Sequence, residues 1–145
     1  MRVRTALLLT LASACASGGP AGPAPTLRII PPDEVALVEG QTVEVALPGA
    51  PAPLFIRFAE VGAESRCPQG VQCVWAGDVA ITLAFSGEAT GQLVLHSPTE
   101  TIGPRSGAAG RYRVELLEVT PQPVFQAPRP RPYRVTLRVT VTPGA

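Results

Sequence analysis

The sequence predicts an all-β protein: a single antiparallel β-sandwich, or an open barrel, of about seven or eight short strands with one local disulfide. Several segments alternate apolar and polar residues with a period of two, and none shows a helical period. The 17 prolines and 14 glycines interrupt these segments at regular spacing, which favours short strands and turns over long helices. The apolar fraction of 46% is sufficient for a buried core in a chain of 145 residues.

Four strands are expected before the cysteine-containing stretch. Residues 27–30 form a short first strand, which the following two prolines end. Residues 35–38 and 42–47 flank a turn, and the second of these segments alternates valine and leucine with more polar residues. Residues 54–61 are apolar on both faces except at Arg57 and Glu60, which predicts a central position in a sheet.

Four more strands are expected in the second half of the chain. Residues 79–86 and 92–96 alternate clearly, and residues 87–91 can join them as a hairpin loop. In residues 111–119 the apolar phase shifts near the end of the segment, which suggests a β-bulge. Residues 133–142 show the most regular alternation in the chain and predict the last strand.

Two long segments have no strand pattern. Residues 97–110 are rich in glycine, serine and threonine and predict a polar loop. Residues 121–132 contain five prolines, so they predict an extended, polyproline-like connection that crosses between the two sheets. An alternative role for this proline segment is to dock a partner, because its ordering cost on binding is low.

The N-terminus predicts export and lipid attachment. Residues 1–14 have the charged, apolar and small-residue regions of a signal peptide, and the apolar run is too short to span a bilayer. Ala12-Ser13-Ala14 before Cys15 resembles the lipobox of bacterial lipoproteins, in which that cysteine is acylated. The alternative is an ordinary signal cut after the same A-x-A pattern.

The segment after Cys15 agrees with membrane anchoring. Residues 15–26 are rich in Gly, Pro and Ala and predict a flexible tether, followed by one β-domain over residues 27–145. Acyl chains on Cys15 would bind membrane lipid firmly. Ala16 fits the outer membrane, facing the periplasm, if the host has two membranes. Removal of Arg2 and Arg4 leaves ten basic and eleven acidic residues, which gives no basic footprint for nucleic acid.

Cys67 and Cys73 predict a disulfide, because lipid on Cys15 leaves an even pair in an exported protein. Trp75, the only tryptophan, is expected to cover this disulfide or close the end of the sandwich, and Gly77 permits a tight bend. The spacing does not match a C-x-x-C redox pair. With His96 as the only histidine, a zinc site is not expected. A loop presented to a partner, as in some protease inhibitors, stays open as an alternative.

The whole stretch resembles the S-R-C-P-x-x-V-x-C-[IV]-W-A-G signature of a family of uncharacterised bacterial exported proteins, often lipoproteins. The resemblance covers roughly residues 35–141, implies one β-domain with a local disulfide, and gives no catalytic residues to transfer. We expect structural roles for the motif residues Arg66, Pro68, Trp75 and Gly77. Relatives commonly have Asp where this chain has Glu64, which is expected to pair with Arg66.

The residues favour a protein without catalysis or cofactors. His96 is expected at the surface, and Ser97 beside it points to the opposite face of a strand. We therefore expect a membrane-anchored, non-catalytic envelope domain with a binding or accessory role and an envelope protein as a partner. A protease inhibitor presenting the Cys67–Cys73 loop is the alternative. An envelope hydrolase using Glu60, Glu64 or Asp78 is the least favoured.

Overall fold

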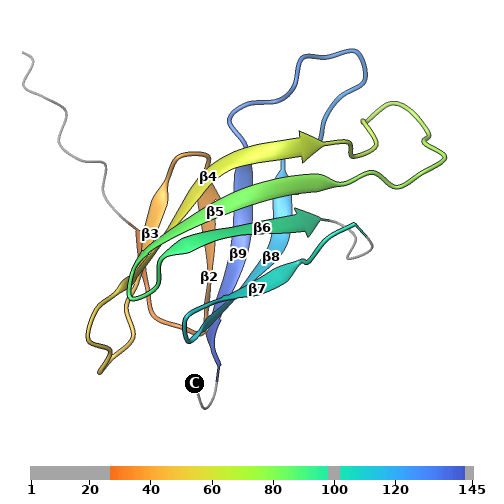
Figure 1. Cartoon of the computed structure of the whole chain (residues 1–145). Coiled ribbons are helices and arrows are strands. Elements are labelled where there is room, and N and C mark those ends of the chain that lie inside the picture. Colours follow the sequence, from red (N-terminus) through yellow and green to blue (C-terminus); the bar gives the residue numbers. More distant parts are fainter. Residues whose placement is uncertain (1–26, 98–101, 143–145) are drawn as a thin grey trace, which may run out of the picture.

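The computed structural model describes residues 27–97 and 102–142, and this part of the chain forms nine strands in two packed sheets (Figure 1). The fold is the predicted all-β sandwich. The predicted signal peptide, Cys15 and the predicted tether lie outside the described residues. The described part of the chain offers no helix that could span a bilayer. The strands are β1 (Leu27–Ile29), β2 (Asp33–Val38), β3 (Thr42–Val45), β4 (Leu54–Glu64), β5 (Val79–Gly87), β6 (Gly91–Ser97), β7 (Ser106–Ala109), β8 (Tyr112–Thr120) and β9 (Arg134–Val141).

The two sheets have the orders β1-β3-β4-β5-β6 and β2-β9-β8-β7. The turn at residues 39–41 therefore carries the chain from one sheet to the other, because β2 pairs with β9 while β3 pairs with β4. One pair departs from the expected antiparallel arrangement: the three-residue β1 pairs in parallel with β3. Strand β2, which separates β1 from β3 in the sequence, lies in the other sheet and reverses the chain, so β3 runs in the same direction as β1.

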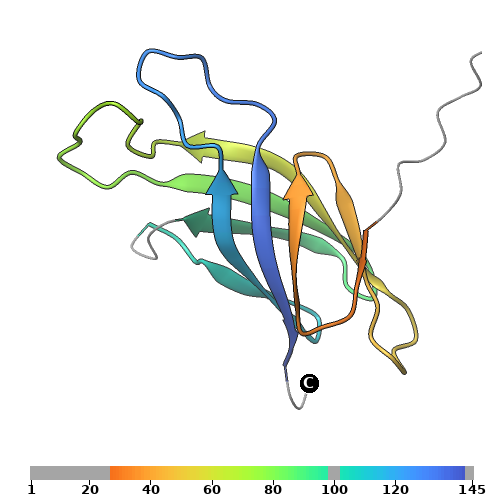
Figure 2. The ribbon, with the colours of Figure 1, turned by 180° about the vertical axis from the view of Figure 1, so that it is seen from behind.

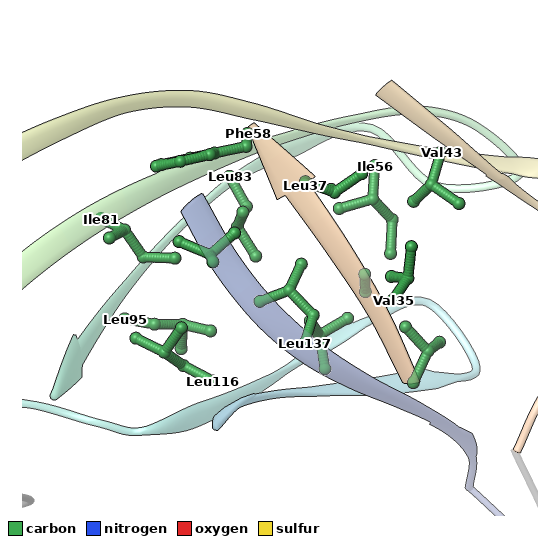
Figure 3. Packing of buried hydrophobic residues seen from close by; sticks show 14 of the residues in the cluster. Val35, Leu37, Val43, Ile56, Phe58, Ile81, Leu83, Leu95, Leu116 and Leu137 are labelled. Carbon is green, nitrogen blue, oxygen red and sulfur yellow. The ribbon is translucent and has the colours of Figure 1, made fainter. Parts of the chain in front are cut away.

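The core lies between the inner faces of the two sheets, where apolar side chains from both interdigitate (Figure 3). Ile56 and Phe58 of β4 face Leu37 of β2 and Leu137 of β9, and all four are fully buried. The alternation read from the sequence produces this arrangement, since successive residues of a strand point to opposite faces. In β9 the buried positions are Val135, Leu137 and Val139, as predicted.

Strand β4 is central, between β3 and β5, as its two-sided apolar pattern predicted. The hairpin of β5 and β6 and the bulge in β8 are confirmed, the latter as a register shift between Leu116 and Glu118. Strand β7 falls in the segment predicted as a loop. Its sequence, SGAA, carries no large apolar residue to mark it. Gly107 in β7 allows close packing, because a Cβ there would lie 2.6 Å from a methyl carbon of Leu93.

The prediction that residues 121–132 cross between the two sheets is wrong. This segment joins β8 to β9, which are antiparallel neighbours in the same sheet. Such neighbours need only a short connection, so the length of this one serves another purpose. It extends beyond the end of its sheet and meets the loop between β4 and β5 (Figure 2).

Candidate functional site

Two long loops lie together at one end of the sandwich (Figures 1 and 2). The first is residues 65–78, between β4 and β5, and the second is residues 121–132, between β8 and β9; together we call them the paired loops. The amide of Gln69 donates to the carbonyl of Pro123 at 2.8 Å, and the amide of Phe125 donates to the carbonyl of Gln69 at 3.1 Å. The Gln122 side chain also donates to the carbonyl of Cys67 at 2.8 Å. Each loop therefore holds the other in place.

The base of the first loop is closed by hydrogen bonds between Ser65 and Asp78. The amide of Ser65 donates to the carbonyl of Asp78 at 2.7 Å, and the amide of Asp78 donates to the hydroxyl of Ser65 at 3.1 Å. Gly77 makes this closure sterically feasible, because a Cβ there would lie 1.6 Å from the carbonyl oxygen of Ser65. The predicted tight bend at Gly77 is thus a close backbone approach.

The Cys67–Cys73 disulfide is present, with Cα atoms 5.8 Å apart. It closes the tip of the first loop into a small ring, in which Pro68 is half-buried. The ring also contains Gln69, the residue that bonds to the second loop. The disulfide therefore shapes the part of the loop that contacts its neighbour.

Arg66 connects the first loop to both sheets. Its guanidinium forms a two-pronged pair with Glu64 at the end of β4, with Nε–Oε1 and Nη2–Oε2 distances of 2.9 and 2.5 Å. It also donates to the carbonyls of Val119 at 2.6 Å and Pro121 at 3.0 Å. The predicted pair of Glu64 with Arg66 is confirmed. Such planar, charge-assisted hydrogen bonds are among the strongest in proteins.

Arg129 of the second loop and Tyr133, which directly follows that loop, complete this network. The Tyr133 hydroxyl donates to Glu64 Oε2 at 3.1 Å, and Arg129 donates to the carbonyl of Gly62 at 2.7 Å while lying over the Tyr133 ring. Burial raises the pKa of the Glu64 carboxyl, but the hydrogen bonds and charge of Arg66 and the Tyr133 hydroxyl outweigh it. The net effect is a pKa below the ordinary value. Glu64 therefore carries its charge at neutral pH.

The expectation that Trp75 covers the disulfide or closes the end of the sandwich is wrong. Trp75 is 83% exposed and its neighbour Val74 is 89% exposed. The end of the sandwich is already occupied by Arg66, Glu64 and Tyr133, so the loop extends past it and presents Trp75 to solvent. The loop is anchored by hydrogen bonds and the disulfide, and Trp75 contributes little to holding it.

Replacing Trp75 with alanine should therefore change the free energy of unfolding by less than about 1 kcal/mol, because the side chain has little to lose from its surroundings. Urea unfolding followed by circular dichroism measures this. A buried tryptophan of the same size would cost about 3–5 kcal/mol. A loss in that range would contradict the exposed position.

Replacing both Cys67 and Cys73 with serine should lower the free energy of unfolding by about 2 kcal/mol, less than the 3 kcal/mol of a 15-residue loop, because the closed ring is short. The larger effect should be local, with faster amide exchange at Gln69 and Phe125 and unchanged exchange in β4 and β9. Hydrogen exchange measured on the oxidised protein and on this variant distinguishes a local effect of the disulfide from an effect on the whole fold. Uniformly faster exchange would mean that the disulfide holds the whole fold.

His96 is half-buried and paired, and is thus less exposed than the predicted surface position. Its Nδ1 lies 2.6 Å from Oδ2 of Asp78, which is almost fully buried, and its side chain is only 19% exposed. A Cβ on Gly103 would overlap the His96 ring, so the two pack closely. The pair could have been anticipated from the hairpin register, which places His96 opposite Ala80, two residues after Asp78.

The three carboxylates considered for hydrolysis do not meet. Glu64 is engaged by Arg66, Asp78 by His96, and Glu60 is exposed on β4. Among the described residues, His96 is hydrogen-bonded to Asp78 and to no serine or cysteine side chain. In the part of the chain that the structure describes, no three His, Cys, Asp or Glu side chains lie close enough together to hold a metal ion.

A cavity of about 370 Å³ lies between the base of the paired loops and β8. Its lining includes Arg66, Gly77, Arg105 and Leu117. Arg105 donates to the carbonyls of Leu116 and Leu117 at 2.8 and 2.9 Å, and Arg66 is paired with Glu64. Both guanidiniums thus have a structural use, and the cavity lies beneath the exposed tips of the loops.

Comparison with protein-family models, curated proteins and solved structures found no match. The family resemblance of residues 65–77 stays a prediction. What this chain can do follows from the chemistry of its own surface.

That surface is most unusual at the paired loops. Five of the nine large apolar side chains that are exposed in the described residues lie there, on two short segments. Single exposed apolar residues are ordinary on protein surfaces, but several on two loops that are joined to each other indicate an interaction site. The five are Val71, Val74, Trp75, Val124 and Phe125.

Proposed function

We propose that this chain is a lipid-anchored, non-catalytic domain of the bacterial cell envelope that binds another envelope component through the paired loops. The single observation that carries the proposal is the exposure of Trp75, 83%, on a loop whose base is fixed. Burying a tryptophan contributes more to binding than burying almost any other side chain. Because Trp75 is exposed in this chain, a binding partner can still bury it.

The loops are suited to binding because they are already ordered. The disulfide, the Glu64–Arg66 pair and the hydrogen bonds between Gln69 and the second loop fix their backbones. A loop ordered before binding avoids the entropic cost of becoming ordered in the complex. This rigidity supports a recognition role over a purely structural one, since the network ends below Trp75 and leaves it free.

Anchoring by lipid rests on the sequence and on the use of the thiols. Cys67 and Cys73 are joined to each other, which leaves Cys15 as the remaining cysteine of the chain. The intact mass of the envelope-extracted protein tests the anchor: we expect Cys15 at the N-terminus with added acyl groups. An unmodified Cys15, or a chain retaining residues 1–14, would contradict it.

The alternative function, a protease inhibitor, has less support than a binding domain. An inhibitory loop pairs its backbone with the protease in an extended conformation, and it needs free amides and carbonyls to do so. In the Cys67–Cys73 ring, the amide and the carbonyl of Gln69 are both used by the second loop. A protease would have to displace residues 123–125 to reach them.

A photo-crosslinking side chain at position 74, in the native envelope, tests the binding proposal. Position 74 is 89% exposed, so the substitution leaves the fold intact. We expect crosslinking at 74, either to one envelope protein or to lipid. The matched control is position 94, a valine 46% exposed on β6, where we expect none. Equal crosslinking at both positions would overturn a specific role for the paired loops.

A further inference from the structure

We propose that the occupant of the paired loops is the membrane surface itself: Trp75, Val74 and Phe125 insert into the boundary between lipid headgroups and acyl chains. This inference rests on the proposed function, because it assumes that Cys15 holds the domain close to a bilayer. It adds a second, non-covalent attachment to the first.

The first observation is the absence of charge at the loop tips. Residues 69–77 and 121–128 contain no Asp, Glu, Lys or Arg, and their polar side chains are chiefly glutamines. A charged side chain is costly inside the hydrocarbon, whereas tryptophan is enriched at the membrane interface. A site for a protein partner usually surrounds its apolar anchors with a polar, partly charged rim. The tips lack such charges and fit a lipid surface better.

The second observation is the shortage of free N–H groups in the tip of the second loop, residues 121–128. Insertion into lipid requires that N–H and C=O groups find partners within the protein. Pro121, Pro123 and Pro128 have no N–H to satisfy. The amide of Phe125 donates to Gln69, and the amide of Ala127 donates to the carbonyl of Val124 at 3.1 Å. The proline-rich sequence, which a sheet crossover does not explain, lowers this desolvation cost.

The third observation is the position of the arginines. Arg129 and Arg131 directly follow the uncharged tip of the second loop. Arg129 is held by the carbonyls of Val61 and Gly62, whereas Arg131, although paired with Glu39, keeps 57% of its side chain exposed. Arginine immediately behind an inserted apolar tip is placed to meet anionic headgroups.

The reach of the tether permits both attachments at once. The twelve residues from Cys15 to Thr26 extend at most about 40 Å. The eleven-residue β4, which runs toward the paired loops, is about 36 Å long. The domain can therefore lie along the membrane, with acylated Cys15 and the paired loops in the same leaflet.

Trp75 is the only tryptophan of the chain, so its fluorescence reports directly from the loop tip. The test uses the mature chain, residues 15–145, with Cys15→Ser to remove the acyl groups, and vesicles of phosphatidylethanolamine and phosphatidylglycerol. We expect the emission to move to shorter wavelength as vesicles are added, and to be quenched by lipids brominated on the acyl chains. The combined variant Val74→Ser and Phe125→Ser, which keeps Trp75, should weaken vesicle binding about tenfold or more.

Val94→Ser is the control, since it removes an exposed apolar side chain away from the loops; vesicle binding should not change. Unchanged Trp75 emission at about 1 mM lipid would overturn the proposal. An attachment as weak as that of a single acyl chain, about 10⁴ M⁻¹, would already bind most of the protein at that lipid concentration. Equal binding by the parent and the Val74/Phe125 variant would also overturn it. If Trp75 emission does not change when vesicles are added while position 74 crosslinks to one envelope protein, lipid docking is wrong and the proposed binding function stands.

Discussion

Replacing Gly77 with alanine should destabilise the domain by about 3 kcal/mol or more, at the upper end of the cost of overpacking. The added Cβ would lie 1.6 Å from the carbonyl oxygen and 2.4 Å from the carbonyl carbon of Ser65. These are backbone atoms, so no side chain can turn aside to make room. The hydrogen bonds between Ser65 and Asp78 would have to break, which opens the base of the first loop.

Urea unfolding at neutral pH measures the loss, and Gly62→Ala is the matched control. Gly62 lies on β4, and a Cβ there would be 3.7 Å from its nearest neighbour, an ordinary contact. That variant should unfold at nearly the same urea concentration as the parent. If Gly77→Ala matches Gly62→Ala, the loop base must be open in solution and the fixed geometry proposed for the binding surface is wrong.

The regular strands were predictable because burial imposes a period of two on them. An apolar face is presented to the common core by β5, β6, β8 and β9, and it appears in the sequence as apolar residues at every second position. The Glu64–Arg66 pair was predictable for a related reason: the two residues are close in sequence and opposite in charge. Local patterns sufficed where local contacts decide the structure.

The candidate site was less predictable because long-range contacts set it. Whether Trp75 is buried depends on what fills the end of the sandwich, and Tyr133, 58 positions later in the chain, contributes to that. The strand pattern of the sequence holds no signal that residues 121–132 pair with Gln69, since the bonds join backbone groups. The Asp78–His96 pair likewise requires the register of the β5–β6 hairpin.

Removing the Arg66 side chain should be about as damaging as the change at Gly77, for an electrostatic reason. The side chains of Arg66 and Glu64 are only 12% and 6% exposed. Removing one partner of such a pair leaves a buried charge without compensation, at a cost of about 3 kcal/mol or more. The carbonyls of Val119 and Pro121 would lose their donor as well. Arg66→Ala should therefore loosen both paired loops together.

The loss should depend on pH, and its direction follows from Glu64. In the parent, the pKa of Glu64 is lowered in the folded state, so its charge stabilises the fold above the unfolded pKa of about 4.3. That contribution disappears as the pH falls through the folded pKa. In Arg66→Ala only burial and the Tyr133 hydroxyl remain, burial raises the pKa of Glu64, and protonation relieves the buried charge. The difference between parent and variant should thus shrink from about 3 kcal/mol at pH 7 to about 1 kcal/mol at pH 3, where only the lost hydrogen bonds count.

Adding Glu64→Gln to Arg66→Ala separates this explanation from simple loss of packing. The neutral amide removes the unpaired charge, so the double variant should be more stable at pH 7 than Arg66→Ala alone and should lose the pH dependence of the difference. Arg28→Ala, at a largely exposed pair with Glu44, serves as the control and should cost less than about 1 kcal/mol. If the double variant is no more stable than Arg66→Ala, the guanidinium acts through packing and its carbonyl contacts. The charge of Glu64 would then have no part in fixing the surface that presents Trp75.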